Sequence, residues 1–136
     1  MSTLFTKIIA GELPGRFVYR DELSVAFLTI APICTGHTLV VPRIEIDHWV
    51  DLPDEVAGHL AIVARKIGVA QMKAFSADRI SLIIAGLEVP HTHLHVLPIT
   101  SEADIDFRKA NPAIAPTELD AAADSLRSAL GPDGSR

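Results

Sequence analysis

The chain has 136 residues, of which 49% are hydrophobic, and it carries a formal net charge of −5. This length and apolar content predict one compact domain, over residues 1–136, with enough apolar side chains for a real core. The negative charge argues against broad nucleic-acid binding, and no run of 18 apolar residues suggests a membrane span.

The first residues and the cysteine content bear on the cellular compartment. No basic segment followed by a long apolar segment opens the chain, so we expect no signal peptide. Cys34 is the only cysteine, which excludes an intramolecular disulfide and fits a reducing environment. We therefore expect a cytoplasmic protein.

The first hundred residues show alternating helical and strand patterns. Residues 4–10 predict a short helix that ends at Gly11, before the Pro14-Gly15 pair. Short apolar runs rich in β-branched residues predict five strands. These are residues 16–20, 24–30, 38–42, 79–84 and 91–98. The chain is therefore predicted to form an α+β fold with an antiparallel sheet of about five strands.

Two longer helices are predicted. The first begins with Asp51 as N-cap and runs to about Phe75, with apolar residues three or four positions apart. Its stripe consists of Val56, Leu60, Val63, Ile67 and Ala70. A polar segment follows at 101–116, and a capped helix is predicted from Thr117 to about Leu130. The main part of the fold is expected over about residues 4–98, with residues 101–136 as a C-terminal extension of the same domain.

Three of the six histidines, His91, His93 and His95, alternate along the last predicted strand. Side chains at alternate positions share one face of a strand, so these rings are predicted to form a row. Leu94 and Val96 would then face the core. Imidazole is polar and titrates near neutral pH, so such a row suits an anionic ligand such as a phosphate with its substituents.

A metal site is the main alternative for this row. The first and third histidines of a straight strand lie about 13 Å apart. A zinc ion needs its nitrogen ligands about 2 Å from one point, so only two neighbouring rings of the row could share it. A metal would need further ligands, and His37 is one candidate.

The segment from His91 to Pro98 resembles the alternating signature of the histidine triad (HIT) family of nucleotide hydrolases and transferases, although Thr92 is a poor match to its apolar position. Three other blocks resemble the family in the same order. They are Leu4–Pro14, with Phe5-Thr6-Lys7-Ile8-Ile9 and Gly11-Glu12-Leu13-Pro14; Val25–Leu28; and Pro32 followed by Gly36–Arg43. The four blocks span about residues 4–98.

The resemblance implies a HIT-like fold that assembles as a homodimer. It also implies roles for particular residues. His93 would be the nucleophile, His91 and His95 would assist on either side, and His37 would support them. The base and ribose would contact Leu4, Phe5, Ile8, Phe27, Thr29, Ile30 and Leu39, while Gly86, Leu87 and Val89 would lie beside the phosphate.

The chain departs from the family pattern at three places. Thr29 replaces an aspartate that takes the ribose hydroxyls, and threonine cannot form a bidentate, charge-assisted pair. Leu87 replaces a glutamine, and an asparagine before the turn is missing. Thr3 and Thr6 occupy the cysteine positions of a structural zinc site found in some members; hydroxyls are poor zinc ligands, so we expect no metal and no cofactor, with His48 as a possible remnant of the site.

The resulting hypothesis is a nucleotidyl hydrolase that releases a nucleoside monophosphate from a phosphoramidate, an adenylate or a dinucleoside polyphosphate, through a nucleotidyl-histidine on His93. The losses at Thr29 and Leu87 leave a second hypothesis, a nucleotide-binding regulatory protein with weak or no catalysis. A metal-binding protein that uses the row and His37 is the third.

Overall fold

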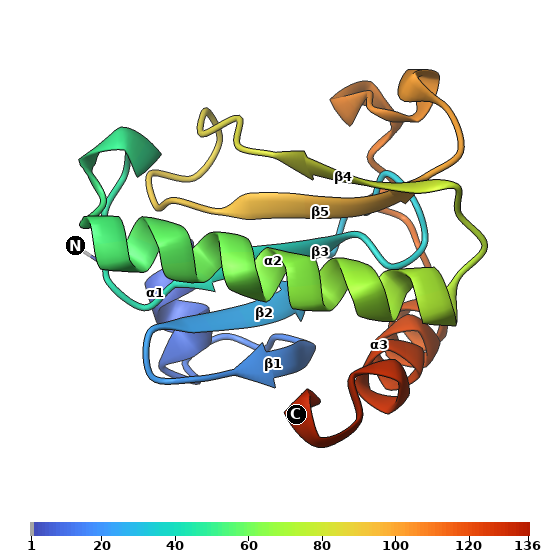
Figure 1. Cartoon of the computed structure of the whole chain (residues 1–136), viewed down its shortest axis with the longest axis horizontal. Coiled ribbons are helices and arrows are strands. Elements are labelled where there is room, and N and C mark those ends of the chain that lie inside the picture. The colour runs from blue at the N-terminus through green and yellow to red at the C-terminus, as the bar shows by residue number, and fades with distance from the viewer. Residues whose placement is uncertain (1) are drawn as a thin grey trace.

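The computed structural model describes Ser2–Arg136 as a five-stranded antiparallel sheet with helices on both faces (Figure 1). The strands are β1 (Phe17–Arg20), β2 (Ser24–Leu28), β3 (Thr38–Pro42), β4 (Arg79–Ile83) and β5 (Leu94–Ile99). Their order across the sheet is β1-β2-β3-β5-β4. The two edges are therefore β1 and β4, and β5 lies inside the sheet.

The three α-helices take different positions on this sheet. The long α2 (Asp54–Ala74) crosses one face, and α3 (Pro116–Leu130) packs beside its C-terminal end and against β1, whereas the short α1 (Leu4–Ile9) lies behind the sheet (Figure 1). Short 3-10 turns occupy Trp49–Asp51, Glu102–Asp104, Phe107–Lys109 and Gly131–Asp133. None of the helices formed by the described residues is long and apolar enough to cross a membrane.

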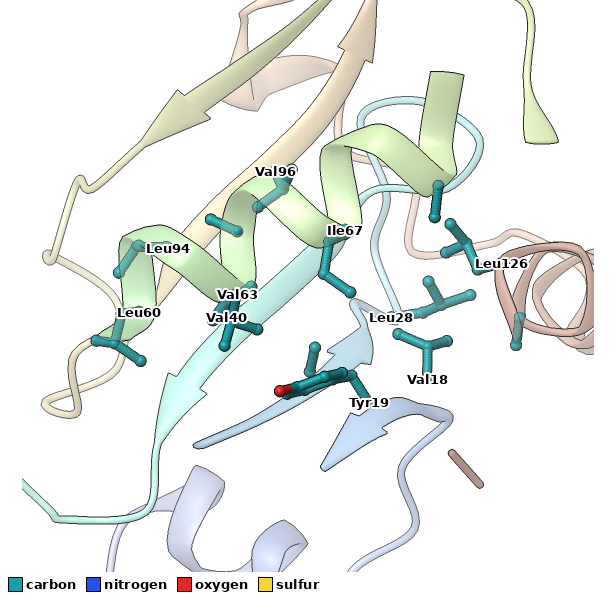
Figure 2. Close-up of a cluster of buried hydrophobic side chains, with 14 of the residues drawn as sticks. Val18, Tyr19, Leu28, Val40, Leu60, Val63, Ile67, Leu94, Val96 and Leu126 are labelled. Atoms are coloured by element: carbon teal, nitrogen blue, oxygen red, sulfur yellow. The ribbon is translucent and has the colours of Figure 1, made fainter. Parts of the chain in front are cut away.

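The α2 face of the sheet carries the main hydrophobic core (Figure 2). The predicted stripe of α2 is buried along its whole length and packs on alternate strand residues, including Val40, Leu94 and Val96. From α3, Leu126 closes the core at the β1 side, where it is fully buried near Val18. Each fully buried aliphatic side chain of this kind contributes about 1.5–3 kcal/mol to folding.

The helix starts differ from the prediction. Residues Trp49–Asp51 form a 3-10 turn, so Asp51 is not the cap of α2; the helix begins at Asp54, after Pro53, with no side-chain cap. Helix α3 likewise begins at Pro116, which suits the first helical turn because proline needs no hydrogen-bond partner for its nitrogen. Thr117 therefore lies inside the helix and does not cap it.

The predicted histidine strand begins three residues late. In the register of β3 and β5, Val40 pairs with Leu94, so continuing the ladder would place Pro42 opposite Thr92. Pro42 has no N–H to give to a ladder. The Thr92 N–H binds the Ile46 carbonyl at 2.8 Å instead, and the His91 N–H turns back to Val89 at 2.7 Å. Only His95 of the row lies within a strand.

Candidate active site

His95 places the candidate site on the face of the sheet opposite α2. Its neighbours Leu94 and Val96 point into the main core, so the alternation of the strand turns His95 to the other side. There its ring lies 5.0 Å from that of His93, between ring centroids. Phe5 of α1 packs edge-on against His93 at 4.9 Å. Helix α1 thus forms one wall around the histidines.

His37 is joined directly to His95. The His37 Nε2 and His95 Nδ1 atoms lie 2.9 Å apart, and the N–H of Ile33 donates to His37 Nδ1 at 3.1 Å. Because a backbone N–H can only donate, His37 Nδ1 must be the unprotonated nitrogen. In neutral rings, His37 Nε2–H then donates to His95 Nδ1, and His95 carries its proton on Nε2.

The turn before β3 holds His37 in place. Gly36 has φ +87, and a Cβ atom there would lie 2.3 Å from the Phe75 ring, so only glycine fits. Its carbonyl accepts hydrogen bonds from the Gln71 side-chain amide at 2.9 Å and the Thr38 hydroxyl at 2.7 Å. The scaffold helix α2 therefore fixes the residue that precedes His37.

The ring of His93 is oriented by the backbone. Its Nδ1 lies 2.8 Å from the carbonyl oxygen of His91, an atom that can only accept. The proton of a neutral His93 must therefore sit on Nδ1, which leaves an electron pair on Nε2. The pair His93 and His95 consequently combines a free nitrogen lone pair with a ring N–H donor.

His91 is fully buried and has a different environment from its two neighbours. Its Nε2 lies 2.8 Å from the Pro42 carbonyl and its Nδ1 lies 2.7 Å from the Thr3 hydroxyl. Both ring nitrogens are thus occupied by protein groups. This arrangement places His91 behind His93, not beside a ligand that His93 and His95 would share.

Burial keeps these rings neutral. Desolvation, together with the neighbouring His95 and His93, lowers the pKa of His37 to about 3. Desolvation and the neighbouring His93 lower the pKa of His95 to about 4. Desolvation also lowers the pKa of His91, against the opposing influence of the Pro42 carbonyl and Glu45. His37, His91 and His95 are therefore neutral at pH 7, and His37 and His95 have the tautomers derived above.

The expected base-binding residues fall into two groups. Phe5, Ile8, Phe27 and Leu39 are buried in one apolar cluster on the histidine face, with Val89 packed against it. Leu4 and Ile30 are exposed, at 49% and 73%, and lie outside that cluster. Phe17 is buried in the same cluster, stacked edge-on against Phe27 at 5.8 Å, although the sequence did not single it out.

The departures from the family pattern are visible as local contacts. The Thr29 hydroxyl accepts a hydrogen bond from the Ala31 N–H at 3.2 Å. In the turn that precedes His91, Gly86 adopts a positive φ of 75° and the next side chain, Leu87, is 93% exposed. An apolar group therefore projects into solvent where the family pattern has a glutamine.

Phe107 is a site neighbour that sequence reasoning missed. Its ring packs edge-on against His95 with 4.9 Å between centroids. The segment that carries it is tied across the chain by the Asn111 N–H, which donates to the Pro32 carbonyl at 3.0 Å. No periodic pattern marks Phe107 in the sequence, because this contact depends on the path of an irregular segment.

The residues at the positions where some family members hold a structural zinc do not fit a zinc ion in this chain. Thr3 and Thr6 offer hydroxyls, and both bind other protein groups. Within Ser2–Arg136, no group of three or more His, Cys, Asp or Glu side chains is arranged to hold a metal ion. A hydrogen-bonded network occupies this place.

Comparison with known proteins decides the family. The family model described as HIT domain matches residues 10–102. The chain belongs to the HIT domain family. A HIT-like protein of Saccharolobus solfataricus is 38% identical in an alignment 111 residues long that covers 78% of this chain and 79% of that protein. The purine nucleoside phosphoramidase of Escherichia coli K12 is 36% identical over 103 residues, covering 70% of this chain and 85% of that enzyme.

Solved HIT structures share the fold. A zinc-bound histidine triad family protein from Mycobacterium smegmatis superposes with a TM-score of 0.82 at 30% identity, over 96% of this chain and 94% of that one. The predicted HIT-like α+β fold is thereby confirmed. The match covers 96% of this chain, whereas the family model ends at residue 102, so the likeness reaches into the C-terminal extension.

Proposed function

We propose that this HIT protein is a nucleotidyl hydrolase with His93 as its nucleophile. The observation that carries the proposal is the geometry that, in neutral rings, pairs an unprotonated His93 Nε2 with a His95 Nε2–H donor, both fixed by partners whose donor or acceptor roles are unambiguous. A nucleophilic nitrogen beside a donor is what nucleotidyl transfer needs at a phosphorus atom.

The reaction has two steps. In the first, a bond forms between His93 Nε2 and the α-phosphorus while the bond from phosphorus to the leaving group breaks, and the leaving amine takes up a proton from solvent. His95 Nε2–H donates a hydrogen bond to a phosphate oxygen as charge shifts onto it. In the second step, water attacks phosphorus and loses a proton to solvent while the bond to His93 breaks, which releases a nucleoside monophosphate and restores the ring. His91 acts through its carbonyl, which holds the His93 ring.

The apolar cluster and the relatives support the substrate class that we propose. Phe5 packs against His93 and belongs to the same apolar cluster as Phe27 and Leu39, which would pack against a base. The similar Escherichia coli protein is named a purine nucleoside phosphoramidase. An adenosine phosphoramidate is therefore our proposed model substrate, with release of AMP.

A regulatory nucleotide-binding protein is the second candidate. It is favoured by the Thr29 hydroxyl, which cannot replace a carboxylate on the ribose, and by Leu87, which faces solvent. Such a protein would bind AMP without turning over a phosphoramidate.

Steady-state turnover of adenosine phosphoramidate separates the two candidates. We expect AMP release by the wild type and by His48→Ala, since His48 is exposed and is not part of the proposed site. AMP binding without any turnover would support the regulatory candidate and contradict the hydrolase.

We further propose a homodimer that pairs through the β4 side of the sheet. As an edge strand, β4 has backbone groups free to pair with a second copy. Exposed apolar side chains lie on β4 and on α2, namely Leu82 at 51%, Val69 at 44% and Met72 at 46%. Sedimentation should give twice 14.6 kDa for the wild type and for Leu87→Asp, whereas Leu82→Asp should give a monomer. A monomeric wild type would contradict this assembly.

The proposed compartment is the cytoplasm. Cys34 is the only cysteine and is a free, half-buried thiol, so no intramolecular disulfide can form, which fits a reducing compartment. Desolvation and the nearby Asp104 raise its pKa to about 11, so it is a protonated, unreactive thiol at pH 7.

A further inference from the structure

A network of hydroxyl and carboxylate groups lies behind His91, at the start of α1. The Glu45 carboxylate accepts hydrogen bonds from the Thr3 N–H at 2.7 Å and from the Thr6 hydroxyl at 2.8 Å. The Thr3 hydroxyl lies 2.7 Å from His91 Nδ1. The loop after β3 and the N-terminal helix are thereby joined to the histidine segment.

The direction of the hydrogen bond between Thr3 and His91 follows from the other contacts. His91 Nε2 faces the Pro42 carbonyl, so it carries the proton of the neutral ring, and Nδ1 is left as an acceptor. The Thr3 hydroxyl lies 3.2 Å from the Thr6 hydroxyl and 2.7 Å from His91 Nδ1, and it gives its single proton to His91 Nδ1, because two lone pairs would otherwise face each other across the shorter contact. Its oxygen at the same time accepts from the Thr6 N–H at 3.1 Å, as the N-cap of α1.

The network continues to the nucleophile. His91 is fully buried, held at both ring nitrogens, and its carbonyl oxygen binds His93 Nδ1 at 2.8 Å. A change in the charge or tautomer of His91 would therefore act on the atom that fixes the His93 tautomer. No group of this network touches the free Nε2 of His93.

We infer that Thr3 is a positioning residue for the nucleophile: its hydroxyl keeps His91 neutral with the proton on Nε2, and so keeps the His91 carbonyl and the His93 ring in the reactive arrangement. Thr6 and Glu45 hold Thr3 in place. The inference rests on the proposed function of His93, and it assigns a catalytic consequence to residues that lie outside the substrate site.

The competing explanation is that Thr3 serves only as a helix cap. Three substitutions separate the two roles. Thr3→Ser keeps both the cap and the donor. Thr3→Asp keeps a cap oxygen but has no proton to donate, and its carboxylate favours a second proton on His91 Nδ1. Thr3→Val loses both functions, and Thr117→Val is the matched control on the exposed start of α3.

The first measurement uses no substrate. Long-range ¹H–¹⁵N NMR of the full-length protein at pH 7 should show the proton of His91 on Nε2 and that of His93 on Nδ1 in the wild type, Thr3→Ser and Thr117→Val. In Thr3→Asp, His91 should be protonated on both nitrogens. In Thr3→Val, His93 should show a mixture of the two tautomers.

The second measurement is the single-turnover rate with adenosine phosphoramidate. Loss of one hydrogen bond is worth about 1 kcal/mol, so Thr3→Val and Thr3→Asp should slow the rate about fivefold, while Thr3→Ser should restore it. Thermal unfolding should leave Thr3→Asp as stable as the wild type, because its cap is kept.

The outcomes are distinguishable. If Thr3→Asp leaves the ¹⁵N shifts of His91 and His93 and the single-turnover rate unchanged, Thr3 is only a cap and the inference fails. If the wild type shows no turnover at all, the proposed function fails, and the NMR signals alone still decide whether Thr3 sets the state of His91. Wild-type His91 protonated on Nδ1 would also overturn the inference.

Discussion

The two faces of the sheet are held together in different ways. On the α2 face, side chains such as Leu60, Ile67 and Val96 pack without polar partners, and stability depends on volume and apolar area. On the histidine face, buried imidazoles form hydrogen bonds with individual groups, namely the Ile33 N–H, the Pro42 carbonyl and neighbouring histidine rings. The α2 face can therefore exchange one apolar group for another at small cost, whereas on the histidine face both ring nitrogens of His37 and of His91 have specific partners.

The largest effect is expected from substitution of the proposed nucleophile, which should abolish turnover with little change in stability. His93→Ala removes the nitrogen that we propose attacks phosphorus, so turnover of adenosine phosphoramidate should fall at least about a thousandfold. The melting temperature should change little, since the ring contributes few contacts to the main core. Full turnover by His93→Ala would contradict the mechanism, and His48→Ala is the matched histidine control.

A cavity in the core on the α2 face should have the reverse effect, which is lower stability with little change in turnover. Ile67 of α2 is fully buried against the sheet, so Ile67→Ala should lower the free energy of unfolding by about 2–5 kcal/mol. The turnover of the folded fraction should stay near that of the wild type. Urea unfolding gives the first quantity and turnover at low temperature the second. An exposed neighbour provides the control, because Ile62→Ala should cost far less.

Acid should destabilise the histidine face selectively. His37 and His95 have pKa values lowered to about 3 and about 4, below the value near 6.5 of an unfolded histidine. The unfolded chain therefore binds more protons below pH 6.5, so the stability from these neutral rings is complete above that pH and is lost as pH falls toward 4 and then 3. Each ring adds a slope of up to about 1.4 kcal/mol per pH unit.

The matched comparison for this pH dependence is His37→Gln. This variant should flatten the fall of unfolding free energy between pH 6.5 and 4, because one of the two titrating rings is gone. Urea titrations at several pH values measure the slope. An identical slope in wild type and variant would show that His37 is not held neutral by the fold.

A smaller effect is expected at the ribose position. Thr29→Asp supplies a carboxylate, and its second oxygen can keep the hydrogen bond from the Ala31 N–H. A hydrogen bond to a charged group is worth about 1.5–3 kcal/mol, so AMP should bind roughly tenfold tighter or more. Affinity for dAMP should change less, and calorimetric titration of both nucleotides measures the difference. A wild type that already prefers AMP strongly would contradict this interpretation of Thr29.

The scaffold was largely predictable from the sequence, because its physics is local and periodic. The spacing of the α2 stripe predicts a helix, and the alternation of Leu94 and Val96 around His95 predicts a strand. The start of β5 was not predictable in the same way. It depends on Pro42, a residue of another strand, which ends the ladder before it reaches His93.

Parts of the candidate site also lay beyond sequence pattern. The four histidines were identified by their spacing and by the family resemblance, but the burial of both His91 nitrogens depends on Thr3 and Pro42, which are distant in the chain. Phe107 reaches His95 from an irregular segment. Such contacts combine residues without a common period, so three-dimensional placement was needed to find them.

The central claim is that His93 Nε2 forms a bond to the α-phosphorus, and rapid quenching tests it most directly. Enzyme mixed with adenosine phosphoramidate should be quenched within the first turnover, digested under mildly basic conditions and analysed by mass spectrometry. We predict one adenylyl group per active chain, mapped to His93 and lost in acid. AMP formed in a burst without any protein-bound adenylyl group, or an adenylyl group on His95 or His37, would contradict the account.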